Sequence, residues 1–208
     1  SLGFAISCDI EINKAVQFAN LASGVVVGKI GSATVTLNEI FDYESSLKKS
    51  YSNEHIKSWD EIDQIVREFK NKDKKIVFTN GCFDILHVGH IRYLSQARSL
   101  GDILVVGINT DESVRSLKGP SRPINSLNDR SLLLSELVCV DYVVSFKEQT
   151  PLKLIKMIMP DILVKGGDYT LDTVVGSNDV IDAGGKVELL KFHDGYSSTK
   201  YIDKIKKR

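Results

Sequence analysis

The feature that most constrains the fold is a regular alternation of short apolar runs and helical patterns from residue 56 onward. The run Ile103–Ile108 is apolar throughout, as expected of a strand covered on both faces. Four other runs have the length of strands: 75–79, 142–145, 162–164 and 186–190. Strands that alternate with helices predict an α/β fold with a doubly wound parallel sheet. Five strands are expected over about residues 75–190, with helices on both faces and ligands at the carboxyl ends of the strands.

Helical periodicity indicates where the intervening helices lie. The pattern over 59–70 is the clearest, and Ser58 precedes it as an expected N-cap. Further helices are predicted at 87–101, 129–139, 151–159 and 173–183, and from about Ser198.

The first 55 residues differ in composition from the rest. Residues 1–42 are rich in small residues and include a predicted helix for which Asp9 is the expected N-cap. Residues 43–55 are polar and serine-rich, which predicts a linker. We therefore expect three segments, 1–42, 43–55 and 56–208. The absence of an initiator Met suggests a piece of a longer protein.

Composition narrows the classes of partner. The 208 residues carry no net charge, which gives no support for general attraction to nucleic acid or to a membrane. The three cysteines form no CxxC pair and suit a reducing, cytoplasmic location. No apolar run reaches the roughly 20 residues that span a bilayer, and no signal peptide is visible. Small-molecule partners are expected.

The strongest chemical motif runs from Thr79 to His90, between a predicted strand and a predicted helix. His87 and His90 are three residues apart and share a helix face. Gly81 permits close approach of the backbone to a phosphate. The start of a helix attracts anions, so the segment predicts a polyphosphate site. Two alternatives are simple helix capping and a metal site, which would need a third ligand.

Three further clusters follow predicted strands, as expected of one ligand site. They are Gly107–Asp111 with the cationic loop Lys118–Pro123, the run Val164–Tyr169, and the hydroxyl-rich Gly195–Lys200. Each has a simpler explanation: an ordinary charged loop, a glycine turn and a helix cap. Arg130 is open to either interpretation. GxGxxG is absent, and Gly24–Ile30 lacks the spacing of a P-loop.

Together these residues resemble the nucleotidyltransferase superfamily marked by HxGH. Within it they look most like the adenylyltransferase half of the bifunctional heptose-7-phosphate kinase/heptose-1-phosphate adenylyltransferases. The similar runs are TNGCFDILHVGH (79–90), VGINTDESV (106–114), LKGPSRPIN (117–125), VDYVV (140–144), ILVKGGDY (162–169) and GYSSTK (195–200). Residues 1–42 resemble the C-terminal end of a ribokinase-like sugar kinase without its catalytic segment. The resemblance implies a Rossmann-like domain over 56–208.

The resemblance also implies a reaction and roles for residues. ATP, with Mg²⁺ bridging its oxygens, would adenylylate D-glycero-β-D-manno-heptose 1-phosphate, and the full-length protein would be a homodimer. His87, His90 and Lys118 would act on the phosphates, with His90 contributing most. The residues implied at the nucleotide are Asn80, Gly81, Phe83, Asp84, Gly107, Asn109, Asp111, Ser197, Ser198 and Thr199. Lys165, Asp168 and Arg122 would face the sugar phosphate, and no protein metal site is implied.

Two other readings stay open. One is a different HxGH enzyme, such as a glycerol-3-phosphate or ethanolamine-phosphate cytidylyltransferase. The other is a non-catalytic assembly module. Cytidylyltransferases place an Arg-Thr pair where this chain has Phe192 and His193, so Lys191 or Lys165 would have to supply the missing charge.

Overall fold

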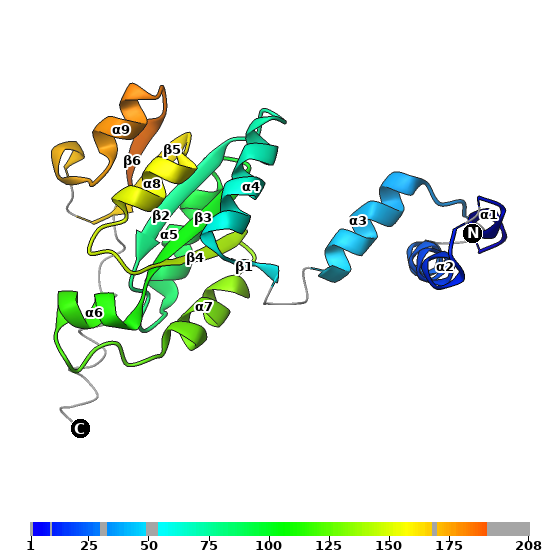
Figure 1. The fold of residues 1–208 in the computed structure, drawn as a ribbon, viewed down its shortest axis with the longest axis horizontal. Coiled ribbons are helices and arrows are strands. Elements are labelled where there is room, and N and C mark those ends of the chain that lie inside the picture. Colours follow the sequence, from blue (N-terminus) through cyan, green and yellow to red (C-terminus); the bar gives the residue numbers. More distant parts are fainter. Residues whose placement is uncertain (1, 9, 30–32, 49–53, 168–169, 191–208) are drawn as a thin grey trace. The chain divides into compact units, whose positions relative to one another are not determined.

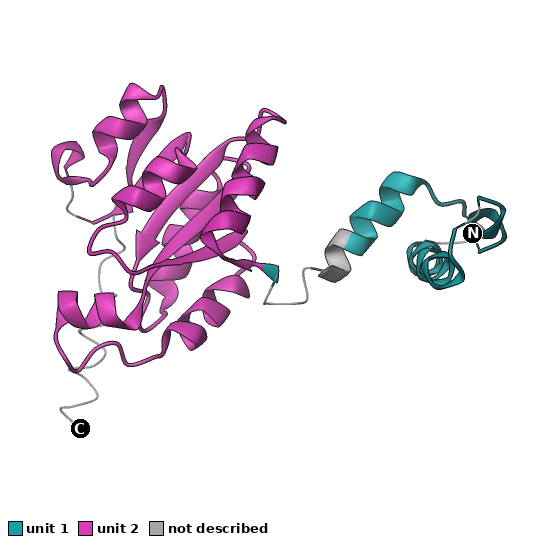
Figure 2. Cartoon of the chain, viewed as in Figure 1, with its two compact units in different colours: residues 1–54 teal, residues 55–208 magenta. Residues whose placement is uncertain are grey.

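The structure, a computed structural model, describes residues 2–8, 10–29, 33–48, 54–167 and 170–190. The chain divides into two compact units, residues 1–54 and 55–208 (Figure 2). None of the helices in the described ranges is long and apolar enough to cross a membrane.

The first unit is built from three helices, α1 (Leu2–Ser7), α2 (Ile12–Val27) and α3 (Leu37–Lys48). Its buried apolar side chains are mostly alanines, as the small-residue composition suggests. The expected N-cap was wrong: α2 begins after Glu11, whose side chain makes no capping hydrogen bond, and Asp9 lies outside the described residues. Helix α3 runs through residue 43, where the linker was expected to begin. The boundaries 1–42, 43–55 and 56–208 stay a prediction.

The second unit contains a parallel sheet with the strand order β1-β4-β3-β2-β5-β6 (Figure 1). The strands are β1 (Ile56–Lys57), β2 (Ile76–Gly81), β3 (Ile103–Asn109), β4 (Tyr142–Phe146), β5 (Ile162–Gly166) and β6 (Lys186–Leu190). The predicted doubly wound α/β fold is confirmed, and five strands lie over residues 76–190 as expected, but a five-stranded sheet was wrong because a sixth strand precedes them. The sixth strand, β1, is two residues long and pairs with the edge of β4, so it is too short to show a periodicity.

Helices cover both faces of the sheet. One face packs against α4 (Trp59–Lys70), α8 (Leu152–Ile158) and α9 (Ser177–Asp182), and the other against α5 (Val88–Arg98) and α7 (Leu127–Ser135). The central strand β2 alternates between the two cores, with Ile76 and Phe78 on one side and Val77 on the other.

Local signals explain where the helices begin and end. Ser58 is the expected N-cap of α4, and it forms a capping box with Glu61. The helix predicted at 173–183 is interrupted: a 3-10 turn covers Leu171–Thr173, and α9 begins only after Gly176, whose φ is 82°. The helix expected from Ser198 lies outside the described residues.

The topology places a crevice at the centre of the sheet. Strand β2 lies between β3 and β5, and the chain leaves β2 toward β3 before it returns on the other side. This reversal of strand order is the point where open α/β sheets bind ligands. The segment between β2 and α5, which ends at His87, and the first turn of α5, which contains His90, lie directly beside it.

Candidate active site

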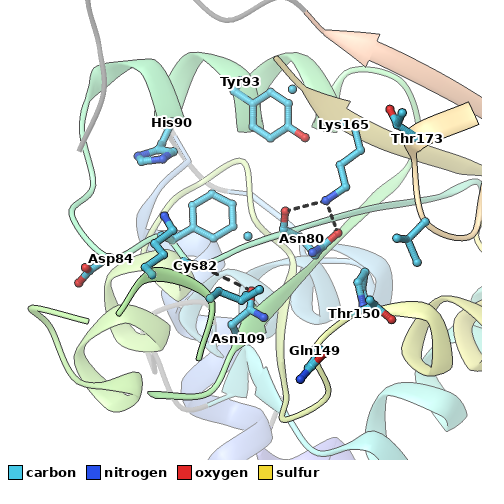
Figure 3. A pocket seen from close by; sticks show the side chains of 17 residues that line it. Asn80, Cys82, Asp84, His90, Tyr93, Asn109, Gln149, Thr150, Lys165 and Thr173 are labelled. Atoms are coloured by element: carbon cyan, nitrogen blue, oxygen red, sulfur yellow. Dashed lines mark hydrogen bonds between the residues drawn. The ribbon is translucent and has the colours of Figure 1, made fainter. Parts of the chain in front are cut away.

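A cavity of about 480 Å³ lies at the carboxyl ends of β2, β3, β4 and β5 (Figure 3). Its volume is typical of a small-molecule site. The lining residues come from every strand end at the crevice: Asn80, Gly81, Cys82, Phe83, Asp84, His90, Tyr93, Asn109, Leu117, Lys118, Gln149, Thr150, Pro151, Lys165, Gly166, Thr173 and Val175.

The two motif histidines stack on each other at the start of α5. Their ring centroids are 3.8 Å apart and their planes differ by 20°. His87 occupies the N-cap position, with extended backbone angles, and its side chain does not cap the helix. Helix capping alone therefore does not explain the pair. The imidazoles lie where the first N–H groups of a helix offer a positive dipole end to an anion.

The environment of His90 keeps its imidazole neutral. Burial, the neighbouring His87 and the positive charge of Lys118 lower the pKa of His90 to about 4. Burial likewise lowers the pKa of His87. The Nδ1 atom of His90 is buried and has no hydrogen-bond partner among the described residues. A neutral ring retains one N–H donor for a phosphate oxygen, and an arriving anion would favour its protonation.

Phe83 supports the His90 ring from an unusual backbone conformation. Its φ is 45°, in the left-handed region that bulky residues rarely adopt. The two rings lie 5.3 Å apart at 60°. A Cβ on Gly81 would lie 3.0 Å from the Phe83 ring, so glycine at the end of β2 makes room for this packing. Strain of this kind concentrates at functional sites.

Lys165 brings a second cation to the cavity from β5. Its Nζ donates a 2.6 Å hydrogen bond to Oδ1 of Asn80 (Figure 3). Burial lowers the pKa of Lys165 to about 8. Near pH 7 the Lys165 side chain is therefore charged in most molecules, and a phosphate in the cavity would favour the charged form further.

Asp84 ties a distant loop to the motif. Its carboxylate accepts hydrogen bonds from the Arg122 side chain and from the backbone N–H groups of Ile124 (2.7 Å) and Asn125 (3.0 Å). Burial opposes ionisation, but these donors outweigh it and hold the pKa of Asp84 below its usual value. The loop begins just after Lys118, so Asp84 fixes the segment that carries this lysine.

Arg130 is a second clamp, and its side chain is completely buried. Its guanidinium donates to the carbonyls of Cys82 (2.6 Å) and Asn125 (3.0 Å) and to Asp111 (2.6 Å). It therefore joins the motif loop, the start of α6 (Asp111–Lys118) and the segment before α7. Neither of the two interpretations left open for Arg130, a phosphate contact or an ordinary surface charge, describes these contacts, since acceptors inside the protein bind the buried guanidinium.

Two residues of β3 that were predicted to bind the nucleotide make contacts within the protein. Asn109 donates to Ser113 at 2.9 Å and borders the cavity. Gly107 lies within β3, where a Cβ would come 2.8 Å from the Phe78 ring. Its missing side chain is explained by packing in the sheet.

The structure brings together most of the predicted site residues. Eight line the cavity: Asn80, Gly81, Phe83, Asp84, His90, Asn109, Lys118 and Lys165. Four do not line it: His87, Gly107, Asp111 and Arg122. Asp168, Ser197, Ser198 and Thr199 lie outside the described residues, as do Lys191, Phe192 and His193. Gln149 and Thr150 were not predicted; their position directly after the strand predicted at 142–145 was the available signal.

No group of three or more potential metal-binding side chains occurs in the described part of the chain. What the cavity offers is neutral imidazole, lysine ammonium groups and amides around a helix start. This combination suits the binding of phosphate groups.

Comparison with known proteins identifies the class of protein to which the chain belongs. The cytidylyltransferase-like family profile matches residues 78–204, which include the motif and the cavity, and the chain belongs to this family. Its members are nucleotidyltransferases, so the expected superfamily is confirmed and a nucleotide is a substrate.

The similar curated proteins narrow the relationship. The chain is 58% identical over 205 residues to the bifunctional protein HldE of Aliarcobacter butzleri and 56% identical over 206 residues to that of Sulfurimonas denitrificans. Each match covers 99% of this chain but only 42% of the relative. The predicted resemblance to bifunctional enzymes is confirmed, and the chain spans about two fifths of their length.

A solved structure supports the fold independently. The lipopolysaccharide core biosynthesis protein of Thermoplasma volcanium is 33% identical, with a TM-score of 0.50. The match covers 60% of this chain and 99% of that one.

Proposed function

We propose that this chain transfers AMP from ATP to D-glycero-β-D-manno-heptose 1-phosphate, giving ADP-heptose and pyrophosphate for the lipopolysaccharide core. The observation that carries the proposal is the stacked His87–His90 pair at the start of α5, beside a cavity with Lys118 and Lys165. The bifunctional relatives and the lipopolysaccharide core biosynthesis protein named above support this choice of substrate.

This reaction requires the enzyme to position the two substrates and to stabilise the negative charge on the phosphates. A sugar phosphate is already a nucleophile at neutral pH, so its oxygen can attack the α-phosphorus in line without a general base. The new bond joins that oxygen to the α-phosphorus, and pyrophosphate leaves with the electrons of the broken P–O bond. His87 and His90 donate to the α- and β-phosphates, and Lys118 neutralises charge on the facing side.

The remaining assignments follow the positions of the residues. Asn80, Gly81 and Phe83 would border the phosphates, and Lys165 would supply charge to the sugar phosphate or replace the missing arginine. Ser198 and Thr199 would hold the terminal phosphates, and Asp168 the sugar. Mg²⁺ would arrive coordinated by ATP, which requires few protein ligands.

The parent protein has a proposed second activity. Residues 1–42 would be the end of a ribokinase-like heptose-7-phosphate kinase domain, 43–55 a linker and 56–208 the adenylyltransferase. The first unit would contribute to a homodimer of the full-length protein, which would act on cytoplasmic ATP.

A panel of substrates tests the proposal. We expect pyrophosphate release with ATP and heptose 1-phosphate, and little with CTP or with glycerol 3-phosphate. A preference for CTP would favour the glycerol-3-phosphate cytidylyltransferase alternative. Nucleotide binding without pyrophosphate release for every acceptor would favour the assembly module.

A further inference from the structure

We infer that Gln149 and Thr150 determine acceptor specificity by hydrogen bonding to the hydroxyl groups of the heptose farthest from its phosphate. This inference rests on the proposed function and extends it to a part of the cavity that no motif covers. Both residues lie between β4 and α8 and line the cavity.

These two exposed side chains differ from the other amide and hydroxyl side chains of the cavity in having no hydrogen-bond partner in the part of the protein that the structure describes. Among the described residues, neither Gln149 nor Thr150 has a side-chain hydrogen bond. The other amide and hydroxyl side chains are occupied: Asn80 by Lys165, Asn109 by Ser113, Tyr93 by Thr79 and Val164, and Thr173 by Thr170. The amide and the hydroxyl can each donate and accept, as neighbouring sugar hydroxyls require.

The backbone on either side of the pair is fixed. The carbonyl of Glu148 accepts a 3.1 Å hydrogen bond from Ser113 of α6, and Pro151 is buried at the start of α8. The N–H of Thr110 also donates to Phe146, at 3.0 Å. Gln149 and Thr150 are thus presented by an anchored segment, which lowers the entropic cost of binding.

The direction of the acceptor follows from the position of the phosphate site. In-line attack requires the acceptor phosphate to meet the α-phosphate near His90 and Lys118. Gln149 and Thr150 lie on the opposite side of the cavity from His90 and Tyr93 (Figure 3). A sugar joined to the phosphate at carbon 1 and extending across the cavity would bring carbons 6 and 7 to this pair.

A nucleobase fits this end less well. The aromatic residues that line the cavity are Phe83 and Tyr93. Phe83 packs on His90, and Tyr93 lies on α5, the helix that also contains His90. In the described part of the chain, a flat base beside Gln149 would therefore have no aromatic ring to stack on.

Kinetics with two acceptors test the inference. β-D-Mannose 1-phosphate lacks the seventh carbon and its hydroxyl. We expect Gln149→Met and Thr150→Val each to lower kcat/KM for heptose 1-phosphate by about 3- to 10-fold, the effect of one lost neutral hydrogen bond. Mannose 1-phosphate keeps the carbon-6 hydroxyl, so its value should stay unchanged only for the residue that contacts the carbon-7 hydroxyl, and in that variant the preference for heptose falls. The KM for ATP should stay unchanged in both variants.

Control variants separate this role from general damage. Thr150→Ser keeps the hydroxyl and should retain the preference, and Gln96→Met changes an exposed glutamine on α5 outside the cavity. Equal losses with both sugars in both variants, a raised KM for ATP, or unchanged kinetics would each overturn the inference while leaving the proposed function intact. A wild-type protein that releases no pyrophosphate with heptose 1-phosphate would refute the proposed function and this inference together.

Discussion

Replacing Asp84 with asparagine isolates the contact that holds the loop after Lys118. The Asp84 side chain is 1% exposed and that of its partner Arg122 is 11% exposed. Asparagine keeps the size and one acceptor oxygen, but its NH₂ group faces donors. The buried guanidinium loses the carboxylate with which it pairs. Removing one partner of a buried pair costs about 3–5 kcal/mol; we expect about 3 kcal/mol, because Arg122 keeps some contact with water.

Urea denaturation followed by tryptophan fluorescence measures this loss. Trp59 is the only tryptophan, and its Nε1 donates to the carbonyl of Ser145 at 2.8 Å, so it reports on the second unit. Wild type should also lose stability as acid protonates Asp84. Because the folded-state pKa is lowered, the carboxylate stabilises the fold fully above its unfolded pKa of about 4, and this contribution is lost as the pH falls further. Asp84→Asn should lack that part of the acid dependence.

Two results would refute the reasoning. One is a change in unfolding free energy below about 1 kcal/mol, the range of an exposed ion pair. The other is simple additivity in the double variant with Arg122→Gln. If Asp84 and Arg122 interact, the second substitution should lower the free energy of unfolding much less once the first is present.

Three other substitutions test the site and the core. His90→Ala should lower the rate of pyrophosphate release by about 10²–10³-fold with an unchanged thermal midpoint, as expected for one preorganised donor; turnover like that of wild type would contradict the mechanism. Since the pKa of Lys165 is about 8 and its charged form exists below that value, kcat/KM should fall as the pH rises through about 8. Lys165→Arg should move that decline to higher pH, and an unmoved profile would remove Lys165 from the explanation. Gly107→Ala places a Cβ 2.8 Å from the Phe78 ring and should cost about 1–3 kcal/mol in a denaturation assay; an unchanged midpoint would contradict the close packing.

The fold was predictable where the physical signal is local. The apolar run Ile103–Ile108 differs from β3 by one residue, because burial on both faces leaves an uninterrupted pattern. Strand β1 could not be found this way. It is two residues long, and its stability comes from pairing with β4, a partner more than 80 residues away in the chain.

The site residues could likewise be predicted where a local sequence signal marks them and not where their role depends on distant contacts. The histidine motif and Lys165 were predicted because each follows a recognisable strand. Lys118 was predicted from its cationic loop, but it is the last residue of α6, a helix that the sequence analysis did not predict. The roles of Asp84 and Arg130 depend in part on distant partners, Arg122 at 38 residues from Asp84 and Cys82 at 48 residues from Arg130, which no pattern near either residue indicates. Gln149 and Thr150 belong to no motif, and only the folded cavity shows that their side chains are uncommitted.

The buried guanidinium of Arg130 has a consequence for how the protein folds. Its three acceptors, Asn125, Asp111 and Cys82, lie 5, 19 and 48 residues from it in the chain, and each must be in position before the charge is compensated. A partly folded state with an intact core but a detached motif loop would leave this cation short of its acceptors, at a cost of several kcal/mol. The motif loop and the sheet should therefore form and open as one cooperative unit, so that the chain does not populate a folded form with a disassembled site.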